Sequence, residues 1–301
     1  MRSITRSVLL ATIPALLCSA QVHAQAAPPA LPDADPAIWV VKDPDTTIYL
    51  FGTFHALDGK ADWFNDEVKS AFDQSGEIIL EIPPAEDQSA MQKVIAKYAL
   101  DTSGKPLSAK LSPASRDKLT KFLAGMGAPP TSFDKFKPFF AAVMLVMTST
   151  QKLGLTGEKG AEAVLTKAAK EGKKPISGLE TIDYQMSLFD KLPEAEQIEM
   201  LEETLDELDQ VEAMFKRMND AWTRGDADGF ATLMNEMNAD SPAAYKLLIS
   251  DRNTNWAEWI DERLDKPGTV FVGVGAGHLG GKDSVQDMLE KRRIKADRVK
   301  Q

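Results

Sequence analysis

The feature that most constrains the fold is a short pattern that occurs twice, near opposite ends of the chain. Each copy is a β-rich run that leads into Gly-x-x-His, and the copies lie at residues 49–55 and 272–278. In α/β proteins the carboxyl ends of strands line the ligand crevice, so we expect both imidazoles at one edge of a sheet. The glycine three positions before each histidine lets the backbone turn sharply. The fold must therefore bring the two ends of the chain together.

The order of the local patterns predicts a sheet with strands from both ends of the chain. Residues 38–42 and 46–51 are β-rich and flank Asp43-Pro44-Asp45, a turn-forming cluster, so we expect a hairpin. A helix at 65–72 and a strand at 77–82 follow, and the chain ends with a helix at 242–264, a strand at 269–274, a helix at 284–293 and a short strand at 297–300. We predict an α/β (α+β) fold with a central mixed β-sheet, formed as a single domain over residues 37–301.

Residues of about 86–241 lie between these two groups of strands and predict a large helical insertion. Ser112 and Pro113 are typical of a helix start, and Gly125 is expected to end that helix. Residues 139–147 are apolar on all sides, which indicates a buried helix. Residues 193–224 carry one apolar face and one acidic face, which predicts a single long amphipathic helix. One strand is expected inside the insertion, at 174–177.

The first 24 residues have the pattern of a secretory signal. Arg2 and Arg6 precede an apolar stretch at 8–17, and a small-x-small site ends at Ala24. We expect cleavage after Ala24 and a periplasmic or secreted protein, with residues 25–36 as a flexible leader. Cys18 is the one cysteine and follows Leu17 rather than the small residue of a lipoprotein signal. The mature chain is therefore expected to form no disulfide.

The charge of the chain excludes some partners. The formal net charge is −10, and loss of Arg2 and Arg6 with the signal makes it more negative still. Such an acidic protein is not expected to bind nucleic acid or an anionic membrane as its main partner. Beyond the signal, no window reaches about 18 uninterrupted apolar residues, so no transmembrane segment is expected in the mature protein.

The chemistry is expected to centre on the two motif histidines. His55 and His278 are the only histidines outside the signal, and their shared setting favours a functional role over a purely structural one. Glu81 ends a very apolar run, where a charge is costly unless it faces a polar site. The other interpretation is that Glu81 simply emerges into solvent. Two histidines and a carboxylate are a common ligand set for a divalent metal that keeps an open position.

Two further polar clusters supply candidate site residues. In Asp251-Arg252-Asn253, Arg252 is a candidate catalytic residue that would bind an anionic group or stabilise an oxyanion, and Asn253 is a candidate donor to substrate. A surface position suits both residues equally well. Glu180 follows the strand expected at 174–177 and is either a substrate-binding acid or base, or a cap for the next helix.

Taken together, these residues resemble the TraB/GumN family, which is related to the Tiki metalloproteases and more distantly to erythromycin esterases. The resemblance runs from about Ala37 to the C-terminus. The residues that carry it are Leu50 to His55, Glu81, Gly178 to Thr181 with Gln185, Asp251 to Asn253 with Trp256, and Val272 to Leu279.

The resemblance implies an α/β core with a helical insertion. In the Tiki branch it also implies metal-dependent peptidase activity, for which His55, Glu81 and His278 would here hold a divalent ion such as Mn, Co or Zn. One position departs from the pattern: relatives commonly have Gly-Val-Asp where this chain has Gly160-Ala161-Glu162. The role of Glu162 stays open at this point.

Three functions agree with these residues. The first is a metal-dependent hydrolase, most readily a peptidase, in which Arg252 and Asn253 steady the substrate. The second is an esterase-like hydrolase without metal, in which one histidine is the general base for water and a glutamate orients it. The third is a non-catalytic binding protein for a peptide, a signal molecule or a haem-like ligand. For the hydrolases, the substrate would be a peptide or a small ester or amide. The oligomeric state is not predicted.

Overall fold

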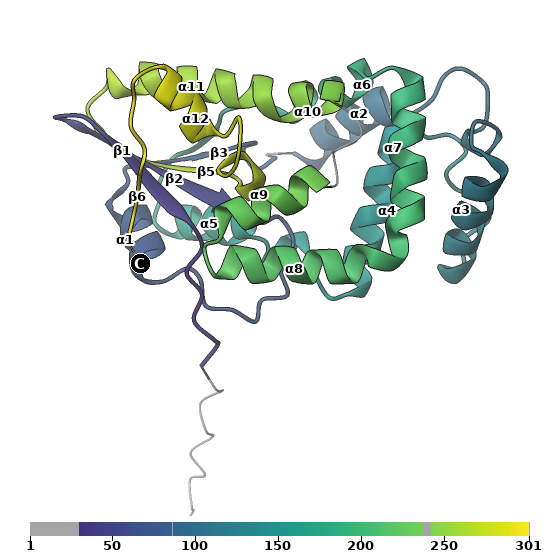
Figure 1. Cartoon of the computed structure of the whole chain (residues 1–301), viewed down its shortest axis with the longest axis horizontal. Coiled ribbons are helices and arrows are strands. Elements are labelled where there is room, and N and C mark those ends of the chain that lie inside the picture. The colour runs from purple at the N-terminus through teal and green to yellow at the C-terminus, as the bar shows by residue number, and fades with distance from the viewer. Residues whose placement is uncertain (1–29, 86, 237–241, 301) are drawn as a thin grey trace, which may run out of the picture. The chain divides into compact units, whose positions relative to one another are not determined.

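A six-stranded mixed sheet lies at the centre of the fold, in the order β4-β3-β5-β2-β1-β6 (Figure 1). Its strands are β1 Ile38–Lys42, β2 Thr46–Thr53, β3 Glu77–Leu80, β4 Ile176–Gly178, β5 Gly268–Gly275 and β6 Asp297–Arg298. The computed structural model describes residues 30–85, 87–236 and 242–300. The expected fold class is confirmed, because strands from the two ends of the chain are neighbours within this sheet.

The strand pairing places the two Gly-x-x-His segments side by side. Strands β1 and β2 form the expected antiparallel hairpin, in which Asp43 Oδ1 accepts hydrogen bonds from the backbone nitrogens of Asp45 and Thr46, at 3.0 and 2.7 Å. Strand β2 then pairs in parallel with β5, and Thr53 lies opposite Gly275 at the end of the ladder. Both motif histidines therefore leave the sheet at the same edge.

Helices cover both faces of the sheet. Their bounds are α1 Asp66–Gln74, α5 Ala161–Glu171, α8 Val211–Thr223, α9 Ala227–Glu236, α11 Asp251–Leu264 and α12 Val285–Lys291. Side chains alternate between the faces of a strand, so Phe271 packs on α1 and α5, whereas Val270 and Val272 pack on α11 and α12. Figure 1 shows the resulting helix–sheet–helix layers.

The helical insertion has a core of its own. Its helices are α2 Gln88–Ala99, α3 Pro113–Gly125, α4 Pro138–Lys152, α6 Ile182–Lys191 and α7 Glu194–Glu207. Helix α3 begins and ends as the sequence predicts, and its Ser112 cap accepts from the backbone nitrogen of Ser115. Helix α4 buries Phe139 and Leu145 but leaves Met147 51% exposed, so the expectation of a helix buried on all sides was wrong at that residue.

The prediction of one long helix at 193–224 was also wrong. A 3-10 turn at Leu208–Gln210 separates α7 from α8, and the two helices run in different directions in Figure 1. The reason lies in their cores: Leu201 packs in the insertion, whereas Trp222 packs against the sheet. A π-helix at Lys246–Ser250 likewise interrupts the helix expected at 242–264, leaving α10 Pro242–Tyr245 and α11.

The N-terminal expectations fall mostly outside the described residues. The signal at 1–24, with Cys18, and residues 25–29 of the expected leader are not described. The end of that leader is packed rather than flexible, since Ala34 and Pro36 are buried and the backbone nitrogen of Ala34 donates to the carbonyl of Asp62 at 3.0 Å. Residues 31–301 form one compact unit. Among the described residues, no helix is long and apolar enough to cross a membrane.

Candidate functional site

The candidate site lies at the edge where four parallel strands end. Strands β2, β5, β3 and β4 pair in parallel, so their carboxyl ends meet there. His55 follows β2, Glu81 follows β3, Glu180 follows β4 and His278 follows β5. Each predicted residue at this edge thus comes directly after a strand, as expected for a ligand crevice of an α/β sheet.

Three of these side chains surround a single point beside Gly275. A methyl group placed on Gly275 would lie 3.4 Å from Glu81 Oε2, 3.5 Å from His278 Cδ2 and 3.8 Å from His55 Nε2. Because glycine carries no side chain, this space stays open between the three groups. The structure therefore brings both histidines and Glu81 together, as the repeated motif predicts.

His55 is held by a carboxylate from the helical insertion. Its Nδ1 lies 2.6 Å from Glu162 Oε1, on the first turn of α5, and its side chain is 69% exposed. Helix α5 packs end-on against this turn, because Ala161 N donates to Phe54 O at 3.0 Å. Gly160 permits this approach, since a Cβ there would lie 2.1 Å from the carbonyl oxygen of His55. The role of Glu162 was not predicted from the sequence.

The ion pair shifts the pKa of both partners. The negative charge of Glu162 raises the pKa of His55 to about 9, although desolvation and the charge of Arg252 oppose the shift. Burial acts to raise the pKa of Glu162, but the charge of His55 outweighs it and the pKa is lowered. At neutral pH, His55 is therefore mostly protonated, with Nε2 directed toward the space beside Gly275.

His278 is in the opposite electrostatic state. Asn253 donates through Nδ2 to the carbonyl of Asp283 at 2.7 Å, so its Oδ1 accepts from His278 Nδ1 at 2.6 Å. This assignment leaves His278 Nε2 with a lone pair, which accepts from Arg252 Nη1 at 3.2 Å. Burial lowers the pKa of His278 to about 3, so the ring is neutral. Asn253 thus fixes the tautomer of His278.

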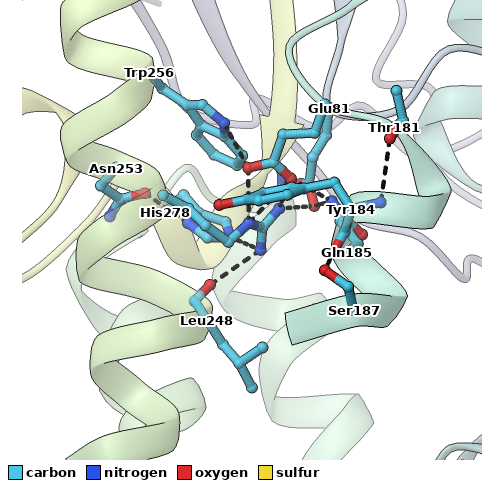
Figure 2. A network of polar contacts seen from close by, with 12 residues as sticks. Glu81, Thr181, Tyr184, Gln185, Ser187, Leu248, Asn253, Trp256 and His278 are labelled. Atoms are coloured by element: carbon cyan, nitrogen blue, oxygen red, sulfur yellow. Dashed lines mark hydrogen bonds and ion pairs between the residues drawn. The ribbon is translucent and has the colours of Figure 1, made fainter. Parts of the chain in front are cut away.

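Arg252 is the hub of a buried network, and all its donors are used within the protein. Figure 2 shows this network with Glu81, His278 and Leu248 labelled. Its Nε and Nη2 bond to Glu180, Nη2 also bonds to Glu81, and Nη1 bonds to His278 and to the carbonyl of Leu248. A guanidinium has five N–H groups, so none is left for a substrate. The arrangement differs from the expected anion-binding role and fits a positioning role.

Glu81 and Glu180 are both buried carboxylates with several donors. Glu81 accepts from Arg252 and from Gln185 Nε2 at 2.6 Å through Oε1, and from Gly275 N at 3.1 Å through Oε2. Burial acts to raise the pKa of Glu81, but the charge of Arg252, the two histidines and the hydrogen bond from Gly275 N lower it to about 2. Glu180 accepts from Trp256 Nε1 at 2.9 Å as well as from Arg252 and Gln185. Glu180 therefore does not serve as the expected helix cap, since Thr181 caps α6.

The network poorly suits a metal at the predicted ligands. Glu81 Oε1 and His278 Nε2 accept hydrogen bonds from the cationic Arg252, so these lone pairs are engaged. A metal needs free lone pairs and is repelled by an adjacent guanidinium. Among the described residues, no group of three or more His, Cys, Asp and Glu side chains is arranged to hold a metal ion. Only His55 Nε2 and Glu81 Oε2 face the open space, and Glu81 Oε2 also accepts from Gly275 N, so the donor set in this arrangement does not fit.

Comparison with known proteins identifies relatives over nearly the whole chain. The TraB/PrgY/gumN family model matches residues 37–298. An uncharacterized protein of Treponema pallidum is 26% identical over 301 residues, which cover 95% of this chain and 90% of the relative. The uncharacterized protein YbaP of Escherichia coli is 29% identical over 184 residues, which cover 61% of this chain and 67% of YbaP. No solved structure matches the chain.

Proposed function

The chain belongs to the TraB/PrgY/gumN family, and from its site we propose that it is a hydrolase of ester or amide bonds in which His55 activates water. The observation that carries this proposal is the open space beside Gly275, which His55 Nε2 and Glu81 Oε2 flank. In the neutral form of His55, which becomes populated as pH rises toward 9, Nε2 carries a lone pair, and a water molecule there would donate one hydrogen to this atom and one to Glu81 Oε2. Peptides and small esters or amides are the proposed substrates.

The proposed reaction is general base catalysis. Neutral His55 accepts a proton at Nε2 while the water oxygen attacks the carbonyl carbon, and the same proton later passes to the leaving oxygen or nitrogen. Glu162 stabilises the imidazolium at Nδ1. Glu81 has a pKa of about 2 and stays ionised, so it orients the water without taking its proton. Arg252 and Asn253 act as positioning residues for Glu81 and His278.

A metal-dependent peptidase using Mn, Co or Zn is the second candidate. One contact favours it, because a carboxylate at the far nitrogen of a histidine also orients metal-binding histidines, and Glu162 lies at Nδ1 of His55. This candidate requires Arg252 to release Glu81 and His278. Loss of hydrolysis on chelation, reversed by one of these metals, would favour it over the metal-free reaction.

Gly275→Ala tests the metal-free proposal directly. The added methyl group meets its neighbours at ordinary contact distances of 3.4 to 3.8 Å, so the fold is expected to persist while the water is displaced. Hydrolysis of p-nitrophenyl acetate and of quenched peptides should fall by about 100-fold or more, the usual scale of general base catalysis. Gly125→Ala is the matched control, because a Cβ at Gly125 has nothing within 4 Å.

Two outcomes of this experiment contradict the proposal. A wild-type rate in Gly275→Ala would show that the space beside Gly275 does not hold the reacting water. Tight retention of a peptide or haem-like ligand by the wild type, with no turnover of any probe, would instead support the non-catalytic binding protein.

We also propose that the hydrolase works in the periplasm or outside the cell. The pattern of Arg2, Arg6 and the apolar residues 8–17 supports export. N-terminal sequencing of the protein recovered from its native host is expected to begin at Gln25. A start at Met1 would contradict this location.

A further inference from the structure

The proposed hydrolysis needs a donor for the carbonyl oxygen that becomes negative during attack. Such donors commonly supply the largest part of acyl-transfer catalysis. Arg252 is the cation nearest to Glu81, but its five N–H groups are all bonded within the protein. The donor must therefore come from another element at this edge of the sheet.

Helix α6 is held firmly against the site. Thr181 Oγ1 accepts from the backbone nitrogen of Tyr184 at 3.1 Å and fixes the first turn. The next residue, Gln185, donates through Nε2 to Glu81 Oε1 at 2.6 Å and to Glu180 Oε2 at 2.8 Å. Because Gln185 binds the carboxylate whose other oxygen faces Gly275, the side chain of Tyr184 starts close to the reacting space.

Tyr184 points into this network and has a free hydroxyl. Figure 2 shows its ring extending from α6 across the hub, with the hydroxyl directed toward His278 and Asn253. Within the described residues this hydroxyl has no hydrogen-bond partner, although the side chain is half-buried. Tyr98, by contrast, donates its hydroxyl to Asp183 Oδ2 at 3.0 Å. The Tyr184 hydroxyl is not among the buried side-chain atoms that lack a partner, so it is open to solvent and available to donate to a ligand.

We propose that Tyr184 is a catalytic residue whose hydroxyl donates a hydrogen bond to the carbonyl oxygen of the substrate. This inference rests on the proposed hydrolysis. As water attacks, the carbonyl π electrons move onto that oxygen, and the hydrogen bond from Tyr184 strengthens. Tyr184 keeps its proton throughout, and the proton from water passes to His55 Nε2. The proposal assigns an ester or amide carbonyl to the position beside the Tyr184 hydroxyl.

Tyr184→Phe, compared with Tyr98→Phe, tests this assignment. With p-nitrophenyl acetate as the probe, kcat of Tyr184→Phe should fall by about 100-fold or more while KM changes little, as on removal of an oxyanion donor. Its Tm should equal that of the wild type, because the hydroxyl has no partner among the described residues. Tyr98→Phe should show the reverse, a lower Tm and an unchanged kcat, since its hydroxyl binds Asp183.

Each other outcome is decisive. An active wild type with unchanged kcat in Tyr184→Phe overturns the role of Tyr184 and leaves the proposed hydrolysis standing. A loss of kcat together with a fall in Tm as large as that of Tyr98→Phe also overturns it, because the hydroxyl would then be structural. A wild type inactive on every ester and peptide probe overturns both proposals.

Discussion

At the scale of the residue, the two motif histidines share a sequence pattern but differ in chemistry. His55 is exposed and paired with Glu162, and its pKa is about 9. His278 is buried between Asn253 and Arg252, and its pKa is about 3. The Gly-x-x-His motif predicted their meeting at one edge but not this difference. Their partners come from helices far away in the sequence, and periodicity does not encode such contacts.

Glu162→Gln is expected to lower the pKa of His55 from about 9 toward its ordinary value of 6.5. The neutral amide removes the charge that raises the pKa, while Glu81 and Arg252 still face the ring with opposite effects. NMR titration of the histidine ring protons measures this change. The rise of the hydrolysis rate with pH should move to lower pH by the same amount. His278 is the internal control and should keep its resonances, and an unchanged pKa of His55 would contradict the pairing.

Arg252→Met is expected to lower the free energy of unfolding by about 3 to 5 kcal/mol, because it leaves buried carboxylates without their cation. Those carboxylates are Glu81 and Glu180, whose side chains are only 11% and 5% exposed. Urea denaturation measures the loss. The matched control is Arg263→Met, whose partner Glu77 is 36% exposed, and its cost should be about 1 kcal/mol or less. Equal costs for the two variants would contradict the hub role of Arg252.

At the scale of the element, the sequence predicted those turns and helices that are set by residues adjacent in the chain. The hairpin follows from Asp43-Pro44-Asp45, and α3 follows from Ser112, Pro113 and Gly125. The break between α7 and α8 was missed because periodicity defines an apolar face without saying which core it packs against. The contact of α5 with the turn of His55 was also missed. In the sequence, the start of α5 shows only a glycine and an acidic first turn, and these do not say which segment the helix contacts.

Gly160→Ala tests how α5 positions His55. A Cβ at Gly160 would lie 2.1 Å from a backbone oxygen that cannot rotate away. The variant should lose about 1 to 3 kcal/mol of stability, the usual cost of overpacking, and the ion pair of His55 with Glu162 should weaken. Thermal unfolding measures the first effect, and the pKa of His55 measures the second. Gly125→Ala, with open space around it, should neither lower the stability nor shift the pKa of His55, and a wild-type result for Gly160→Ala would contradict the contact.

At the scale of the whole molecule, the site exists because strands from both ends of the chain become neighbours. The pairing of Thr53 with Gly275 places both motifs at the carboxyl edge, and this much followed from the repeated motif. The insertion then contributes Glu162, Glu180 and Gln185. The two Gly-x-x-His motifs alone therefore do not complete the site. Glu180 was predicted as a candidate because it follows a strand. The hydrogen bonds of Gln185 to Glu81 and Glu180 could not be predicted from the residues next to it in the sequence.

The stability of the molecule is expected to fall on both sides of neutral pH. Glu81 and His278 have lowered pKa values of about 2 and 3. Their contributions to the free energy of unfolding are complete above their ordinary pKa values of 4.5 and 6.5. These contributions are lost as pH falls through the lowered pKa values. His55 has a raised pKa, so its contribution is complete below 6.5 and is lost as pH rises through about 9. Exposure of His55 makes the alkaline loss the smaller one.

Urea denaturation at pH 4, 7 and 9.5 measures these two losses. Glu162→Gln should remove most of the alkaline loss and the part of the acid loss that Glu162 contributes through its own lowered pKa, while the acid loss from Glu81 and His278 remains. A stability that does not change between pH 4 and pH 9.5 would contradict the assigned charge states.

Hydrolysis of p-nitrophenyl acetate by metal-stripped protein, assayed in excess chelator, tests the central claim most directly. The claim is that His55, paired with Glu162, activates water beside Gly275 without a metal ion. We predict the same rate before and after removal of metal, and a large loss in His55→Gln. A rate that disappears with the chelator and returns with Mn²⁺, Co²⁺ or Zn²⁺ would contradict the claim.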